Sequence, residues 1–322
     1  MKKSVYLALF LAGTLALSGC EQKAEVSKPT TLMGFSQLGA ESAWRLGNTE
    51  SMKTAAAAHG IDMMVDNANQ KQEKQIAAIR SFIAYRVDVI AFSPIVESGW
   101  DTVLTEAKNA NIPVILVDRH IDSLDDSLYS CLVGADFLQE GVSAGEFLLQ
   151  KADETGRDQL NVIEITGTLD STPTVQRQLG FWQTLGDDGR FVRLESVSGD
   201  FLRSKGYECM KQVLEKHGNA IDVIYSHNDS MTLGAVQAME EAGLAPAKDI
   251  IIISVDGEQA AIDLLKEGKL NCVVECTPHL GELVMQMAEK LLAGESVPKS
   301  THPIERVFTE RDDLTDLPKR GY

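Results

Sequence analysis

The chain has 322 residues, 44% of them hydrophobic, and a formal net charge of −17 at pH 7. This length and apolar content suffice for a large buried core, and they suit two domains of about 150 residues better than one. The strong negative charge argues against a nucleic-acid ligand and against electrostatic attachment to anionic lipid.

The first twenty residues have the pattern of an export signal. Lys2 and Lys3 form a short positive region, and residues 5–17 form an apolar stretch shorter than the roughly 20 residues of a transmembrane helix. The sequence LSGC that ends at Cys20 resembles the lipobox of bacterial lipoproteins. We therefore expect a lipoprotein signal peptide over residues 1–19 and a mature protein that begins at a lipidated Cys20, with an uncleaved membrane anchor as the alternative.

The segment after Cys20 is polar, and residues 20–30 are predicted to form a flexible, lipidated tether. Removal of residues 1–19 takes away two lysines and no acidic residue, so the formal net charge changes from −17 to −19. No later apolar run approaches membrane-spanning length. The folded part is expected to be soluble, and to lie in the periplasm or at the outer face of the cell membrane.

From residue 31 the hydrophobic pattern alternates between strands and helices. Continuous apolar runs such as VDVIAFSP and IPVILVDRH are typical of strands buried on both faces, and a strand–helix–strand order with such strands predicts a parallel sheet covered by helices on both sides. The predicted strands are 31–37, 61–65, 87–94, 112–120 and 129–134, and the predicted helices are 41–59, 72–84 and 100–110.

The same order then begins again. The predicted strands are 160–167, 190–197, 220–229, 249–257 and 271–275, the predicted helices are 140–150, 175–185, 205–216, 232–242 and 280–292, and a last stretch covers 298–308. No Pro-Gly linker separates the two α/β units, so we expect paired strands to carry the chain between them. The predicted fold is α/β, with two similar doubly wound parallel-sheet lobes joined by a hinge of crossover strands.

Four cysteines follow Cys20. Cys272 and Cys276 lie in an extended apolar run, where a rise of about 3.3 Å per residue places them about 13 Å apart. This exceeds the roughly 7 Å limit for a disulfide, and no clustered Cys or His spacing predicts a metal site. We expect these cysteines to be small buried hydrophobic residues, and one bridge between distant parts of the chain stays open as the alternative.

Polar and aromatic side chains gather where the predicted strands end. Ligands of open parallel sheets bind beyond the carboxyl ends of the strands, which makes these side chains candidates for binding. Carboxylates, amides and arginines suit the hydroxyls of a sugar, and aromatic faces stack on its ring. Each residue alone also has a structural explanation, as a surface ion pair, a turn residue or part of the core. The set is Gln37, Glu41, Trp44, Arg45, Asp118, Arg119, Arg177, Phe201, Asn228 and Asp256.

Six longer stretches make a resemblance specific. They are GFSQLGAESAWR, QKQEKQIAAIRSFIAYRVD, PVILVDRHID, SGDFLRSKG, YSHNDSM and ISVDG. With them, the chain over about residues 30–322 resembles the sugar-binding proteins of bacterial ABC transporters of the ribose and galactose type, which share their core with LacI-type repressors. Within that group the similarity is greatest to the galactofuranose-binding members.

The resemblance implies the type I periplasmic binding protein fold and the ten residues above as ligand-binding, with Glu275 added from a crossover strand. It implies an N-terminal lobe of residues 30–132 and 278–304 and a C-terminal lobe of residues 133–277 and 305–322. Cys131 then lies near the strand of Cys272 and Cys276 at neighbouring hinge crossings, which makes a disulfide from Cys131 to one of them a hypothesis. The calcium loop of some hexose binders has no match, so no metal or other cofactor is implied.

The implied function is capture of a galactofuranose-like monosaccharide by hinge closure, in a monomer that delivers it to an ABC permease with its ATPase subunit. A role as ligand sensor for a membrane receptor, in chemotaxis or two-component signalling, stays open. A LacI-type regulator is not expected, because the chain has an export signal, an acidic charge and no N-terminal helix-turn-helix. Enzyme activity is not expected either: Glu41, Asp118 and Asp256 suit a glycosidase less well than they suit hydroxyl recognition, and Gly-x-Ser-x-Gly and zinc-binding His motifs are missing.

Overall fold

The computed structural model describes residues 30–322. The predicted signal peptide, Cys20 and nearly all of the predicted tether lie outside the described residues. Within residues 30–322, no helix combines the length and the apolar character that crossing a membrane requires.

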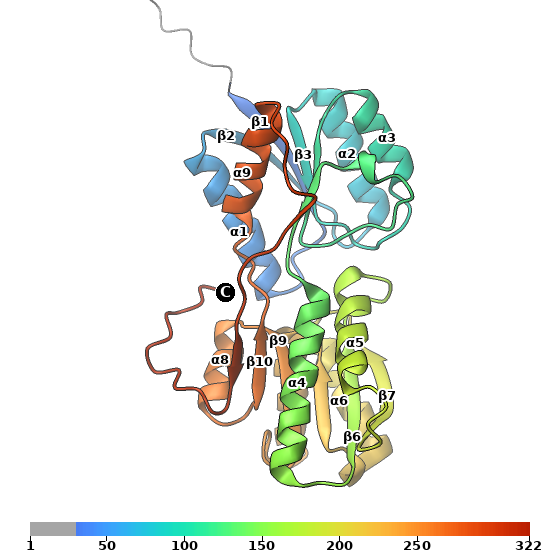
Figure 1. The fold of residues 1–322 in the computed structure, drawn as a ribbon, viewed down its shortest axis with the longest axis vertical. Helices are drawn as coiled ribbons and strands as arrows, with labels where there is room; N and C mark the ends of the chain where they lie inside the picture. The colour runs from blue at the N-terminus through green and yellow to red at the C-terminus, as the bar shows by residue number, and fades with distance from the viewer. Residues whose placement is uncertain (1–29) are drawn as a thin grey trace, which may run out of the picture. The chain divides into compact units, whose positions relative to one another are not determined.

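Two six-stranded sheets with the same strand order form the framework of the described chain (Figure 1). The first has the order β11-β5-β4-β3-β1-β2 and is parallel throughout. The second has the order β12-β10-β9-β8-β6-β7 and is parallel except for β12, which pairs antiparallel with β10. The strands of the first sheet are β1 (Thr31–Gln37), β2 (Ile61–Asn67), β3 (Val89–Phe92), β4 (Val114–Val117), β5 (Cys131–Val133) and β11 (Ser300–Thr301), and those of the second are β6 (Leu160–Thr166), β7 (Phe191–Ser198), β8 (Val223–Ser226), β9 (Ile251–Asp256), β10 (Cys272–Glu275) and β12 (Val307–Thr309).

Helices cover both faces of each sheet, which confirms the predicted pair of doubly wound α/β lobes. On the first sheet, α1 (Ala43–Ala58) and α9 (Gly281–Leu292) pack on one face, and α2 (Gln72–Tyr85) and α3 (Asp101–Asn109) pack on the other. Figure 1 shows the early helix α1 beside the late helix α9, so the chain returns to the first lobe near its end. On the second sheet, α4 (Phe137–Thr155) and α5 (Thr172–Leu185) pack on one face, and α6 (Arg203–His217), α7 (Asp229–Glu241) and α8 (Gln259–Lys266) pack on the other.

The strand β4 illustrates why the buried strands are continuous apolar runs. Its residues Ile115 and Val117 pack with α1 and α9, whereas Val114 and Leu116 pack with α2 and α3. All four side chains are buried, so the alternation of side chains across the sheet places an apolar residue on each face in turn.

The structure departs from the predicted elements in two places. The helix α8 was not predicted, although Ala261, Ile262 and Leu265 form its buried stripe. The last predicted stretch, 298–308, is not one element: β11 belongs to the first sheet and β12 to the second. The chain therefore passes between the sheets three times, after β5, after β10 and between β11 and β12.

The hypothesis of a disulfide from Cys131 to Cys272 or Cys276 is contradicted by the structure. All four cysteines in the described part of the chain are free and buried. Cys131 lies opposite Ile115 in the first sheet, while Cys272 lies opposite Ile253 in the second, so the two cysteines belong to separate sheets. The other prediction for these cysteines is confirmed, since each belongs to an apolar core cluster.

The helices α4 and α5 approach so closely that their backbones touch. A Cβ atom on Gly141 would lie 2.3 Å from the backbone oxygen of Arg177, and one on Gly180 would lie 2.2 Å from the backbone oxygen of Leu138. Only glycine permits this approach, because any side chain at either position would collide with backbone rather than with a movable group. The close contact sets Glu140, beside Gly141, next to Arg177.

Candidate binding site between the two sheets

The cavity that gathers most of the predicted site residues is lined from both lobes. Strand ends place many of its polar groups: Asp118 follows β4, Asp256 ends β9, and Asn228 follows β8 and caps α7. These are the carboxyl ends of parallel strands, where ligands of this fold bind. The cavity is lined by Glu41, Ser42, Trp44, Arg45, Asp118, Arg119, Phe137, Pro173, Arg177, Phe201, Asn228, Asp256 and Cys276.

Nine of the eleven predicted residues are among them, and Gln37 and Glu275 are not. The Gln37 side chain donates to Asn48 Oδ1 at 3.0 Å and to Thr49 Oγ1 at 3.1 Å, so it holds α1 against the end of β1. Glu275 accepts from the Arg306 backbone N–H at 2.9 Å and pairs with Arg320. Both side chains are engaged in contacts that stabilise the fold.

Four lining residues were not predicted: Ser42, Phe137, Pro173 and Cys276. Ser42 lies inside the ESAWR segment, and its hydroxyl caps α1 by accepting from the Arg45 backbone N–H at 3.1 Å. Phe137 and Pro173 begin α4 and α5 just after β5 and β6, so the rule that directs attention to strand ends could have found them.

In the first lobe, Arg45 organises a buried ionic network. Its Nη2 donates to Asp118 Oδ2 at 2.7 Å and its Nε donates to Glu41 Oε1 at 3.1 Å. Burial opposes the charge of Arg45, but Asp118 and Glu41 outweigh it and raise the pKa of the guanidinium. The neighbouring Arg119 has the opposite balance, because burial and the positive charge of Arg45 lower its pKa to about 10.

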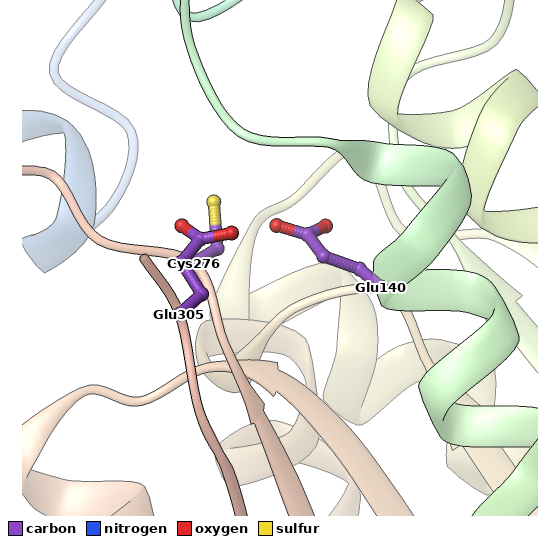
Figure 2. A group of neighbouring side chains, drawn as sticks. All are labelled: Glu140, Cys276 and Glu305. Atoms are coloured by element: carbon purple, nitrogen blue, oxygen red, sulfur yellow. The ribbon is translucent and has the colours of Figure 1, made fainter. Parts of the chain in front are cut away.

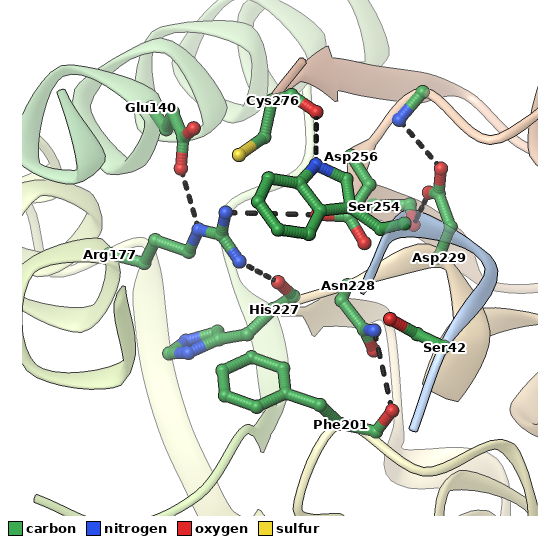
Figure 3. Close-up of polar contacts among 12 residues, drawn as sticks. Ser42, Glu140, Arg177, Phe201, His227, Asn228, Asp229, Ser254, Asp256 and Cys276 are labelled. Carbon is green, nitrogen blue, oxygen red and sulfur yellow. Dashed lines mark hydrogen bonds and ion pairs between the residues drawn. The ribbon is translucent and has the colours of Figure 1, made fainter. Parts of the chain in front are cut away.

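In the second lobe, Arg177 is the centre of a buried polar network, as Arg45 is in the first (Figure 3). Its Nε donates to Glu140 Oε2 at 2.6 Å, its Nη1 donates to the backbone oxygen of His227, and its Nη2 lies 3.8 Å from Asp256 Oδ1. Burial raises the pKa of Asp256 well above its usual range, and the charge of Arg177 only partly offsets this. Asn228 is held by its own cap, with Oδ1 accepting from the Met231 backbone N–H at 3.0 Å and Nδ2 donating to the backbone oxygen of Phe201.

Aromatic rings form the walls of the cavity. The Phe201 ring packs directly against Gly167, where an added Cβ would lie 1.8 Å from the ring, and the guanidinium of Arg119 lies 5.4 Å from the ring centre. The indole Nε1 of Trp44 donates to the backbone oxygen of Cys276 at 2.6 Å, so a side chain of α1 is tied to the crossover after β10. These contacts fix the planes on which a flat ligand would stack.

Two buried polar atoms at this cavity have no hydrogen-bond partner among the described residues. They are Glu41 Oε2, which can only accept, and Arg119 Nε, which can only donate. Leaving such atoms buried and unpaired costs about 1–3 kcal/mol each, and more for charged groups. A ligand hydroxyl both donates and accepts, so it could satisfy either atom.

Comparisons of sequence and of structure both find similarity to sugar-binding proteins. The model of the family "Periplasmic binding protein domain" matches residues 33–296. The galactofuranose-binding protein YtfQ of Escherichia coli (strain K12) is 40% identical, over 95% of this chain and 97% of that protein.

Two solved structures are similarly related. One is a Mycobacterium smegmatis protein in complex with β-D-fucofuranose, with a TM-score of 0.87 and 43% identity over 90% of this chain and 95% of that one. The other is the periplasmic binding protein component of the arabinose ABC transporter from Shewanella sp. ANA-3, bound to α- and β-L-arabinofuranose, with a TM-score of 0.83 and 41% identity over 87% of this chain and 92% of that one. The resemblance noticed in the sequence is confirmed, and this chain belongs to the periplasmic binding protein family.

Proposed function

We propose that the protein captures a monosaccharide in its furanose form, galactofuranose or a close analogue, and delivers it to an ABC permease. The observation that carries the proposal is the cavity with an unpaired acceptor at Glu41 and an unpaired donor at Arg119 beside aromatic walls. The three relatives above are named for galactofuranose or contain a bound furanose, which supports the ring form. The proposed ligand-binding residues are Glu41, Trp44, Arg45, Asp118, Arg119, Arg177, Phe201, Asn228 and Asp256, with Gln37 and Glu275 supporting them from outside the cavity.

The mechanism follows from the fact that the residues lining the cavity come from both lobes. A sugar that bonds to Asp118 of one lobe and Arg177 of the other favours the arrangement in which both reach it, so binding shifts the protein towards its closed form. We assign residues 30–132 and 278–304 to one lobe and residues 133–277 and 305–322 to the other; the strands of the two sheets support this division, except that Val133 is the last residue of β5 in the first sheet. The closed form would then be recognised by the permease and its ATPase subunit.

Delivery to a permease is favoured over a sensor role by the relatives. The arabinofuranose-bound relative is named as a component of an ABC transporter. The three relatives are described as binding proteins or as complexes with a sugar, and none is named as an enzyme. Family membership implies a periplasmic location, in agreement with the export signal in the sequence.

The ring form and the sugar can be tested together. Residues 21–322 contain the whole compact unit of residues 31–322 and can be titrated calorimetrically with galactose, arabinose, ribose and glucose. We expect micromolar or tighter binding of galactose or arabinose, and binding of glucose weaker by about 100-fold or more. Galactose labelled with ¹³C at C1 should show, when bound, the NMR shift of a furanose. A pyranose shift for the bound sugar would refute the ring form, and absence of heat with every sugar would refute sugar capture.

We further propose that residues 1–19 are removed and that a lipid on Cys20 anchors the protein. Expressed in a bacterial host with an alkyne-tagged fatty acid, the wild type should carry the label and sediment with membranes, whereas Cys20→Ala should carry no label. Cys209→Ala is the matched control, because Cys209 is buried and should leave labelling unchanged. Label that persists in Cys20→Ala, or that is missing from the wild type, would contradict the anchor.

A further inference from the structure

A second cluster of polar side chains lies beside the sugar cavity, on segments far apart in the sequence (Figure 2). Glu140 is in the first turn of α4, Cys276 follows β10 on one crossover, and Glu305 lies on the crossover between β11 and β12. One ligand atom of each residue, the two carboxylate oxygens and the sulfur, lies within 4.8 Å of the others. Figure 2 shows the two carboxylates turned towards each other with the sulfur beside them.

Glu140 provides the evidence that this cluster takes a ligand. Its side chain is 3% exposed and its Oε2 accepts from Arg177 Nε, but its Oε1 has no hydrogen-bond partner among the described residues. An unpaired carboxylate oxygen in a buried site is costly, and nothing on α4 or α5 relieves it. The oxygen points at the other two members of the cluster, so whatever satisfies it must sit among all three.

Two carboxylates beside a thiol favour the binding of a cation. Glu305 Oε1 accepts from the Thr277 backbone N–H at 2.7 Å, which fixes that carboxylate on its crossover. Glu140 and Glu305 bring two carboxylates into the same small space, with their ligand atoms within 4.8 Å of each other and of the Cys276 sulfur. Arg177 is the cation that Glu140 already binds, and it faces the sugar cavity.

We propose that Glu140, Cys276 and Glu305 bind one divalent metal ion of the zinc type, with a water molecule as the fourth ligand. A thiolate with two carboxylates suits Zn²⁺, which accepts sulfur and oxygen in one tetrahedral site, and does not suit Mg²⁺ or Ca²⁺, which require oxygen alone. Zinc–sulfur and zinc–oxygen bonds of about 2.3 and 2.0 Å place such ligand atoms about 3.5 Å apart. Side-chain movements of about 1 Å would close the cluster from separations of up to 4.8 Å to that spacing.

The cluster borders a groove that is separate from the sugar cavity. Asp136, Gln139, Ser143 and Arg306 line this groove, and Glu140 and Glu305 lie on its wall, so the ion would enter from this side. A bound ion would join α4 to two of the three crossovers between the sheets. It would thereby restrain the segments that must bend during closure, whichever ligand the cavity takes.

Metal binding is tested with residues 21–322, from which Cys20 is absent, after removal of metals with a chelator. Competition with a chromophoric chelator should give one Zn²⁺ per protein with a Kd in the micromolar range or tighter. Co²⁺ should give the near-ultraviolet thiolate-to-cobalt band and the intense visible bands of tetrahedral coordination. This spectrum needs no variant, and a cobalt complex without the thiolate band would overturn the proposal.

Two variants locate the ion. Cys276→Ala and Glu305→Gln should each weaken Zn²⁺ binding by about 100-fold or more, since removal of a ligand costs at least as much as removal of a group that orients one. Cys209→Ala and Glu295→Gln are the matched controls and should bind as the wild type does. Folding is checked by circular dichroism without metal, and the test uses no sugar, so its outcome is independent of the proposed transport function.

A competing site is also testable. The partly buried His59 bridges Glu282 and Glu289 and could bind a metal adventitiously. Zinc binding that survives in Cys276→Ala and Glu305→Gln but is lost in His59→Gln would overturn the proposal, as would a wild type that binds no zinc.

Discussion

Replacing Asp118 with asparagine is expected to weaken sugar binding by about 100-fold or more while the protein still folds. Asp118 Oδ2 accepts from Arg45 Nη2 at 2.7 Å and lies 3.8 Å from Arg119 Nε, so one carboxylate holds two buried guanidinium groups in place. Asparagine keeps the size of the side chain and tolerates the left-handed backbone of this position, where φ is +68°. It removes the charge that keeps the two cations together and makes Asp118 a strong acceptor for a sugar hydroxyl.

The loss of the charge-assisted hydrogen bond to Arg45 should also lower the free energy of unfolding by about 2 kcal/mol. Calorimetry with the best sugar of the panel measures the binding, and urea unfolding measures the stability. Asp122→Asn is the control, since Asp122 is an exposed aspartate on the same loop and should bind sugar as the wild type does. Equal sugar affinities of the two variants would refute the role of Asp118.

Replacing Arg177 with methionine is expected to abolish sugar binding and to lower the free energy of unfolding by about 3–5 kcal/mol. The side chain is 3% exposed, and its guanidinium contacts Glu140, the His227 backbone oxygen and Asp256 at the same time. Methionine fills a similar volume but leaves two buried carboxylates without their cation. The expected loss of stability comes from these unpaired buried carboxylates rather than from a cavity.

Arg190→Met is the matched control for Arg177→Met. Arg190 pairs with Asp153 and Asp188, but its side chain is 30% exposed, so its loss should destabilise the protein much less than the loss of Arg177. Urea unfolding of both variants gives the comparison, and sugar titration at low temperature tests binding in the folded fraction. If Arg177→Met unfolds at the same urea concentration as Arg190→Met, the buried ionic network does not stabilise the second lobe as described.

Much of the fold could be predicted from the sequence because it depends on local patterns of apolar residues. Buried parallel strands require apolar residues on both faces, so runs such as 112–117 predicted the sheets, and helices with apolar residues at three- and four-residue spacing predicted the covering layers. The helix α8 was missed because it has only eight residues, too few for its stripe to stand out between β9 and β10. The local pattern of residues 298–308 did not separate β11 from β12, and only the family resemblance placed a change of lobe inside this stretch, after residue 304.

The candidate site was readable in part for the same reason. Asp118, Asn228 and Asp256 follow strands, and the carboxyl ends of parallel strands meet at one edge whatever the details of packing. The sequence alone therefore determined the two-lobed α/β architecture, the export signal pattern and most of the residues that line the cavity.

Only the tertiary structure decided which side chains face one another. It showed that Gln37 and Glu275 support the fold from outside the cavity, that Cys131 and Cys272 lie in separate sheets, and that Glu140 reaches Arg177 through the glycine contact of α4 with α5. It also brought together Cys276 and Glu305 from two crossovers. Such pairs are set by how helices pack and where the chain changes sheets, and these long-range contacts have no periodic trace in the sequence.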